Sequence, residues 1–287
     1  MITPSAPIIV SICCITYNHE QYISQTLDGF LMQKTNFNVE ILIGEDCSTD
    51  TTKSIIEDYC NKYPGKIKLI TYEKNIGSIR NHNNIMKLAS GKYIAMCDGD
   101  DFWTHPLKLQ KQVDFLEQNH EYVICCHYTK VIDEKDQVVY LNLDPVKLEY
   151  DYADVLLGKK EETRLCSLVV RNLKEIREIN SKVWYLKVYG ADKIFKIYAV
   201  ASTNKKMYVL PEVMGCYRLH SGGVWSMIDT KLRKSRMISD FNLVIRNFNY
   251  SNTLKRSLLK IYIRDYFLFE VKNLRLNSAV NTIIKLL

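Results

Sequence analysis

Short apolar runs alternate with segments of helical periodicity through residues 8–128, and this alternation limits the folds open to the chain. The apolar runs have the length of buried strands and cover residues 8–15, 39–44, 67–72, 92–97 and 122–128. Between them, apolar residues recur at helical spacing over residues 20–33, 50–63, 79–89 and 106–119. Because strands joined by helices pair in parallel, the pattern predicts an α/β fold with a mostly parallel sheet flanked by helices.

The composition is that of a globular protein. Hydrophobic residues make up 47% of the 287 residues and charged residues 25%, which suits one large domain or one domain with an appendage. No apolar run approaches the roughly 20 residues that span a bilayer, and no Lys or Arg precedes Lys34, so we expect no signal peptide. The nine cysteines form no C-x-x-C pair and several lie in apolar runs, which predicts reduced thiols in a cytoplasmic protein.

The positive charge is concentrated at the end of the chain. Residues 226–287 hold twelve Lys or Arg and four Asp or Glu, so residues 1–225 carry a net charge of −1 out of the total of +7. We therefore predict a near-neutral body over residues 1–225 and a basic, helical C-terminal appendage over residues 226–287.

Basic side chains in this appendage recur every fourth residue, at Arg256, Lys260 and Arg264. Apolar side chains occupy the opposite helix face, at Leu258, Tyr262, Tyr266 and Phe269. One interpretation is peripheral contact with an anionic membrane, worth about 1 kcal/mol per basic residue, on the inner face of the cytoplasmic membrane. The other is a helical cap that packs on the body and leaves a solvated basic rim.

Polar, turn-prone residues follow each of the first four predicted strands, at residues 16–18, 45–46, 75–77 and 98–101. In open α/β sheets, ligands bind at the carboxyl ends of the strands. The sequence therefore predicts a ligand site at this edge of the sheet.

The last of these segments is rich in carboxylates. Asp98 and Asp100 are two residues apart, so in an extended chain they point to the same side, and Gly99 lets the backbone come close to a ligand. Carboxylates this close repel one another unless a cation lies between them. A divalent cation site is the functional interpretation, and a solvated acidic turn is the alternative.

Two residues at the first two strand ends suit a nucleobase. The ring of Tyr17 can stack on a base, and the carboxylate of Asp46 can accept a hydrogen bond from an imino N–H. With a cation nearby to neutralise a diphosphate, the edge is predicted to bind a nucleoside diphosphate.

These motifs together resemble the family 2 glycosyltransferases of GT-A (Rossmann-like) fold. The resemblance covers roughly residues 8–225 and rests on the segments 8–18, 44–50, 75–77, 98–110, 190–192 and 217–225. It implies a bacterial polysaccharide-type, inverting enzyme that moves a sugar from a UDP-sugar donor to a hydroxyl of a glycan or lipid-linked acceptor. It further implies Mn²⁺ or Mg²⁺ as cofactor, a role in cell-surface polysaccharide biosynthesis and residues 1–225 as the catalytic domain.

The resemblance also implies roles for single residues. The donor would be bound by Thr16, Tyr17, Asn18, Asp46, Asn75, Asn81, Asp98, Gly99, Arg218 and His220. The metal would be bound by Asp98 and Asp100, with Asp101 assisting, and Asp192 would be the general base. The alternative for Asp192 is an N-cap of a helix over residues 193–200, and that for His220 is an ordinary surface histidine.

The chain departs from the family pattern at two places. Glu45 stands where an Asp is common, which changes little. After Asn75-x-Gly77, His82 occupies the place usually held by Arg, so the resemblance assigns no phosphate contact there.

Two other functions compete with a glycosyltransferase. A nucleotidyltransferase acting on sugar phosphates would show a Gly-rich phosphate loop after the first strand, and residues 16–20 have none. A nucleic-acid binder is suggested by the basic appendage, but the chain carries no recognised nucleic-acid module, and we expect no nucleic-acid partner. The acceptor-binding part would fall in residues 128–190, which carry no readable motif.

Overall fold

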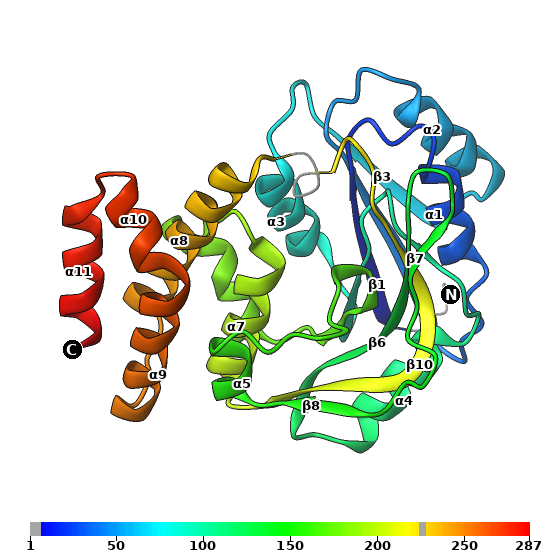
Figure 1. Cartoon of the computed structure of the whole chain (residues 1–287). Coiled ribbons are helices and arrows are strands. Elements are labelled where there is room, and N and C mark those ends of the chain that lie inside the picture. Colours follow the sequence, from blue (N-terminus) through cyan, green and yellow to red (C-terminus); the bar gives the residue numbers. More distant parts are fainter. Residues whose placement is uncertain (1–6, 224–227) are drawn as a thin grey trace.

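The structure is a computed structural model that describes residues 7–223 and 228–287. Its centre is a ten-stranded sheet with the strand order β3-β2-β1-β4-β9-β6-β10-β5 (Figure 1). The four strands at one end of this order are parallel to one another: β3 (Ile67–Thr71), β2 (Asn38–Glu45), β1 (Ile8–Thr16) and β4 (Tyr93–Met96). The predicted α/β fold is confirmed, and each of these strands lies within two residues of the predicted limits.

The other half of the sheet is mixed. β6 (Tyr122–Ile132) and β10 (Lys206–Arg218) are parallel, whereas β9 (Val169–Arg171) runs antiparallel between β4 and β6. Short antiparallel strands complete it: β5 (Phe102–Trp103), β7 (Val138–Tyr140) and β8 (Leu148–Tyr150). None of these short strands has the apolar length that marks a strand in the sequence.

Helices cover both faces of the sheet because alternate strand residues point to opposite sides. In β1, Val10, Ile12 and Cys14 belong to one core, and Cys13 belongs to the other. The first core contains residues of α1 (Ile23–Leu31), α2 (Thr52–Lys62) and α4 (Lys108–Gln118). The second contains residues of α3 (Ser78–Leu88) and α7 (Ala191–Thr203). Between β8 and α7 lie two short helices, α5 (Tyr152–Leu156) and α6 (Lys174–Arg177).

The C-terminal appendage is helical, as predicted. Its helices are α8 (Thr230–Asn247), α9 (Asn252–Tyr262), α10 (Leu268–Lys272) and α11 (Leu276–Leu286). A π-helical turn joins α9 to α10. Apolar residues of α8 and α9 belong to the core that also contains α3 and α7, and α9–α11 lie farther from the sheet (Figure 1). The predicted boundary at residues 225 and 226 lies outside the described residues.

Within the described parts of the chain, no helix combines the length and the hydropathy that a bilayer-spanning helix requires. All nine cysteines are free thiols.

Candidate active site

The carboxyl ends of β1, β2 and β4 border a cavity of about 340 Å³, which we call the first chamber. Residues from all four predicted strand-end segments line it. They include Thr16, Tyr17, Asp46, Asn75, Asn81, Asp98 and Asp100. The structure therefore brings most of the predicted donor-binding residues to one cavity.

Asp46 organises the wall of the first chamber. Its two carboxylate oxygens accept hydrogen bonds from the backbone N–H groups of Ile76 (2.7 Å) and Gly77 (2.9 Å). Gly77 has φ 85°, a conformation that glycine adopts without strain, and α3 begins directly after it. Asp46 thus fixes the loop that starts α3, and it also lines the chamber.

Three asparagines brace the same wall. Asn81 donates to the Gly44 carbonyl (2.8 Å), Asn18 accepts from the Thr49 N–H (2.8 Å), and Asn75 accepts from the Gly77 N–H (3.1 Å). Tyr17 differs from them because its side chain is exposed at the rim. Its predicted stacking on a nucleobase stays a prediction.

Metal-ligating side chains converge beside the first chamber. Among the residues that the structure describes, His19, Asp100 and His220 bring their ligand atoms within 4.8 Å of one another. The Nε2 atom of His220 lies 2.9 Å from Asp100 Oδ2, and that of His19 lies 3.9 Å from the same oxygen. We call these three residues the metal triad.

The donor set fits a first-row transition cation. The Gly222 N–H donates to His220 Nδ1 (3.2 Å), so His220 carries its proton on Nε2, where a metal would displace it. His19 Nδ1 lies 3.2 Å from the Thr16 hydroxyl, which leaves its Nε2 facing Asp100. Two imidazoles with one carboxylate suit Mn²⁺ better than Mg²⁺, which prefers oxygen ligands throughout.

His19 is a residue that the sequence analysis missed. It reaches Asp100 because Gly99 has no side chain: a Cβ there would lie 2.6 Å from Thr16 Oγ1 and 3.0 Å from His19 Nδ1. The available signal was the position of His19, three residues after Thr16 at the end of the first strand.

The carboxylates of the Asp98–Asp101 segment point to different places. Asp98 lines the first chamber, and burial together with the neighbouring charges of Asp100 and Asp192 raises its pKa. For Asp100, burial opposes ionisation, but the hydrogen bond with His220 and the nearby His19 lower its pKa. Asp101 instead accepts from the Arg218 backbone N–H (2.9 Å) and is buried, so it anchors β10.

The guanidinium of Arg218 is held by other side chains and by the Asp100 carbonyl, to which its Nε donates (3.3 Å). The guanidinium pairs with Asp136 (2.6 Å), donates to Gln25 (2.7 Å) and lies 4.7 Å from the centroid of the Tyr22 ring. The predicted diphosphate contact of Arg218 stays a prediction.

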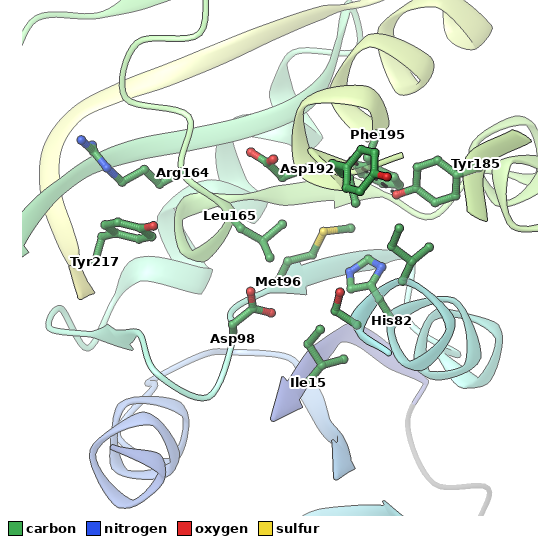
Figure 2. Close-up of a pocket in the computed structure, with 14 residues that line it drawn as sticks. Ile15, His82, Met96, Asp98, Arg164, Leu165, Tyr185, Asp192, Phe195 and Tyr217 are labelled. Carbon is green, nitrogen blue, oxygen red and sulfur yellow. Dashed lines mark hydrogen bonds between the residues drawn. The ribbon is translucent and has the colours of Figure 1, made fainter. Parts of the chain in front are cut away.

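A second chamber of about 350 Å³ continues from the first (Figure 2). Ile15, Ser78 and Asp98 line both chambers, so Asp98 stands where they meet. The remaining lining is largely apolar and aromatic: Ile79, Met96, Leu165, Tyr185, Tyr189, Phe195 and Tyr217. Asp192 lines the far end.

Asp192 does not cap α7. Gly190 occupies the N-cap position, so the N-cap alternative for Asp192 is wrong. The Oδ2 atom of Asp192 lies 3.1 Å from Nζ of Lys196, one turn later on the same helix. Burial opposes ionisation of Asp192, but the charges of Lys196 and Lys160 and the hydrogen bonds from Lys196 and the Lys193 backbone together lower its pKa, so the carboxylate is ionised at neutral pH.

A third chamber of about 520 Å³ lies on the other side of Asp192. It shares Arg164 and Asp192 with the second chamber, and Lys160, Thr163 and Lys196 also line it. The three chambers therefore adjoin in a row, with Asp98 between the first two and Asp192 between the last two.

The appendage holds the helix that carries Asp192. Asp240 of α8 is buried and accepts hydrogen bonds from the backbone N–H groups of Tyr189 (2.9 Å) and Gly190 (2.7 Å). Nothing in the sequence marks Asp240, because the contact spans fifty residues.

Comparison with known proteins agrees with this geometry. A family model for glycosyl transferase family 2 matches residues 11–171, more than half of the chain. The chain belongs to glycosyl transferase family 2. The family 2 protein is 36% identical over 229 residues to Rv1520, an uncharacterized protein of Mycobacterium tuberculosis. The match covers 78% of this chain and 63% of that relative.

Two solved structures share the fold of this family 2 protein. S. aureus TarS 1–349 in complex with UDP-GlcNAc has a TM-score of 0.69 at 19% identity, and the match covers 96% of this chain and 79% of the TarS 1–349 chain. The mannosyltransferase PcManGT of Pyrobaculum calidifontis, in complex with GDP-Man and Mn²⁺, has a TM-score of 0.66 at 16% identity and covers 98% of this chain and 75% of PcManGT. At these identities the likeness shows the fold, which confirms the predicted GT-A type.

Proposed function

We propose that this family 2 protein is a metal-dependent, inverting glycosyltransferase that moves a sugar from a nucleotide-sugar donor to an acceptor hydroxyl. One observation carries the proposal: Asp98 joins the first chamber to the second, and Asp192 joins the second to the third. A nucleotide, a sugar and an acceptor need three adjoining spaces in this order, with a base between the last two.

The first chamber would hold the nucleoside diphosphate. Tyr17 would stack on the base, and the metal triad would hold a divalent cation beside the diphosphate. When bound, the cation would neutralise the charge of the diphosphate oxygens as they leave. UDP is the predicted nucleotide; TarS binds UDP-GlcNAc and PcManGT binds GDP-Man with Mn²⁺, which supports a nucleotide sugar and this metal.

Asp192 would act as the general base of a single displacement. It would take the proton from the acceptor hydroxyl, whose oxygen forms the new bond to the anomeric carbon. The bond from that carbon to the diphosphate breaks at the same time, and the nucleoside diphosphate leaves with the electron pair. Attack on the face opposite the leaving group inverts the anomeric configuration.

The acceptor would enter through the third chamber, beside Lys160 and Arg164. A glycan or lipid-linked acceptor, in cell-surface polysaccharide biosynthesis, is the predicted class. For a lipid-linked acceptor, peripheral contact with an anionic membrane would help, and two exposed surfaces support it. Arg256, Lys260 and Arg264 are exposed on one side of the appendage, and α11 exposes Leu276, Val280 and Ile284 at four-residue spacing.

The test is product analysis with Mn²⁺ and a panel of UDP- and GDP-sugars. The proposal expects slow release of the nucleoside diphosphate, accelerated by the right acceptor. Asp192→Asn should bind the donor normally and transfer the sugar about 10² to 10⁴ times more slowly, as expected for loss of a positioned base. Release of pyrophosphate would instead support a nucleotidyltransferase, and salt-sensitive nucleic-acid binding alone would support the third candidate function.

A further inference from the structure

The second chamber contains one polar atom that the mechanism above does not use. The Nε2 atom of His82 is shielded from solvent and has no hydrogen-bond partner among residues 7–223 and 228–287. His82 lines the chamber, and its ring projects into the space between Met96 and Tyr185 (Figure 2). A buried polar atom without a partner costs free energy unless a ligand completes its hydrogen bonding.

The backbone holds His82 firmly at this place. Ser78, Ile79 and His82 lie on one face of α3, since residues three and four apart are neighbours on a helix, and all three line the chamber. The start of α3 is fixed through Asp46, and Asn81 ties the helix to the Gly44 carbonyl. The imidazole is therefore a preorganised group rather than a mobile one.

The chemistry of the imidazole selects the kind of group that it can bind. Burial lowers the pKa of His82 to about 4, so the ring is neutral at physiological pH. The Nε2 atom of a neutral imidazole either donates one hydrogen bond or accepts one, according to the tautomer, and the ring has no charge with which to neutralise a phosphate. Its partner is thus an uncharged polar group.

The surroundings indicate a sugar. The chamber is lined by aromatic and aliphatic side chains, which suit the C–H faces of a sugar ring, and its few polar groups are placed to select orientation. Asp98 at one end adjoins the proposed nucleotide space, and Asp192 at the other end is the proposed base. A sugar linked to the diphosphate would occupy the space between them.

We propose that His82 is a specificity-determining residue whose Nε2 hydrogen-bonds a hydroxyl or acetamido group of the donor sugar. The proposal rests on the proposed function, because it needs a nucleotide sugar in the two chambers. The proposal also explains why a His occupies a place where an Arg is usual in the family pattern, because this side chain would hydrogen-bond the sugar and not the phosphates.

The experiment compares binding of nucleotide sugars with binding of the bare nucleotides. UDP, UDP-GlcNAc, GDP and GDP-mannose are titrated calorimetrically, with Mn²⁺, into the wild type, His82→Leu and His82→Gln. His82→Leu should weaken binding of the preferred nucleotide sugar about 10-fold, the effect of one lost hydrogen bond, and leave binding of its nucleoside diphosphate unchanged. His82→Gln, which keeps a donor and an acceptor, should restore most of the loss.

A deoxy analogue series of the preferred sugar supplies the second readout. One analogue should bind the wild type about 10-fold more weakly than the parent and bind His82→Leu as well as the parent does. The melting temperature of His82→Leu should equal or exceed that of the wild type, because an unsatisfied polar atom has been removed.

The outcomes separate the two proposals. Equal loss of nucleotide and nucleotide-sugar binding in His82→Leu, or no loss of either, would overturn the role of His82 while the proposed function stands. A wild type that binds no nucleotide in the presence of Mn²⁺ would overturn both.

Discussion

At the residue scale, the proposed base depends on the ammonium of one buried lysine. Lys196 is buried and donates to Thr163 as well as to Asp192. Its positive charge keeps the pKa of Asp192 below the ordinary value although burial acts in the opposite direction. The carboxylate therefore stays ionised, and competent as a base, until the pH falls below the usual range of an aspartate.

Removing this charge should change the pH profile of transfer. In Lys196→Met, the charge that lowers the pKa of Asp192 most is lost together with its hydrogen bond, so this pKa rises and the acid limb of kcat moves to higher pH. Lys196→Arg should keep the wild-type limb. Lys159→Met, which removes an exposed ammonium paired with Asp154, is the matched control and should also leave it in place. An acid limb that does not move in Lys196→Met would remove Asp192 from the role of base.

The acidic residues of the site can be predicted from the sequence for a simple reason. Asp46, Asp98 and Asp100 follow apolar strands, and the carboxyl ends of parallel strands meet at one edge. The sequence did not predict His19 as a ligand, because its one signal, a position three residues after Thr16, is not specific for a metal ligand. The family resemblance implied that Asp101 assists at the metal, whereas in the structure Asp101 accepts a hydrogen bond from the Arg218 N–H.

At the scale of elements, the hydrogen bonds from the start of α7 to Asp240 of α8 fix the position of Asp192, the proposed base. Asp240→Ala should lower the transfer rate at least 10-fold and leave donor binding intact, since a shift of about 1 Å in a reacting group can cost 100-fold. Asp229→Ala on the same helix removes the N-cap of α8 and should cost about 1 kcal/mol of stability without affecting transfer. Comparable steady-state rates in the two variants would show that α8 does not position the base.

Burial and strand pairing also explain which strands the sequence predicts and which it does not. β1, β2 and β4 are apolar runs with mostly buried residues on both faces of the sheet, which is the pattern that their composition predicts, whereas β3 at the edge of the sheet is only partly buried. The three-residue strands β7, β8 and β9 form because partners across the sheet supply their hydrogen bonds. β10 contains Pro211, and its register with β6 shifts around that proline, which has no N–H to donate.

At the scale of the whole molecule, the appendage packs as a cap, and its contact with a membrane stays a prediction. Residues of α8 and α9 pack into the core beside α7, as expected of a cap. The exposed basic side chains of α9 and the exposed apolar face of α11 remain free to meet a membrane.

Vesicle sedimentation tests that contact. The protein should bind vesicles of equal parts phosphatidylglycerol and phosphatidylcholine, and not pure phosphatidylcholine, with an affinity that falls as salt rises. Reversing the charge of Arg256 and Lys260 to Glu should weaken binding at least 10-fold, since each basic residue contributes about 1 kcal/mol. The same reversal at Lys62 and Lys66, exposed on the body, is the control. Equal binding by both variants would exclude the appendage as the contact surface.

The proposed active site depends on a cation held beside a nucleoside diphosphate at the edge of the sheet. Calorimetric titration of UDP and GDP into the protein, with and without Mn²⁺, is the direct test. The wild type should bind one of these nucleotides only when Mn²⁺ is present. Asp100→Asn, which removes the carboxylate shared by His19 and His220, should abolish this binding, and the exposed Asp114→Asn should not. Tight, Mn²⁺-dependent nucleotide binding by Asp100→Asn would contradict the assignment of the site.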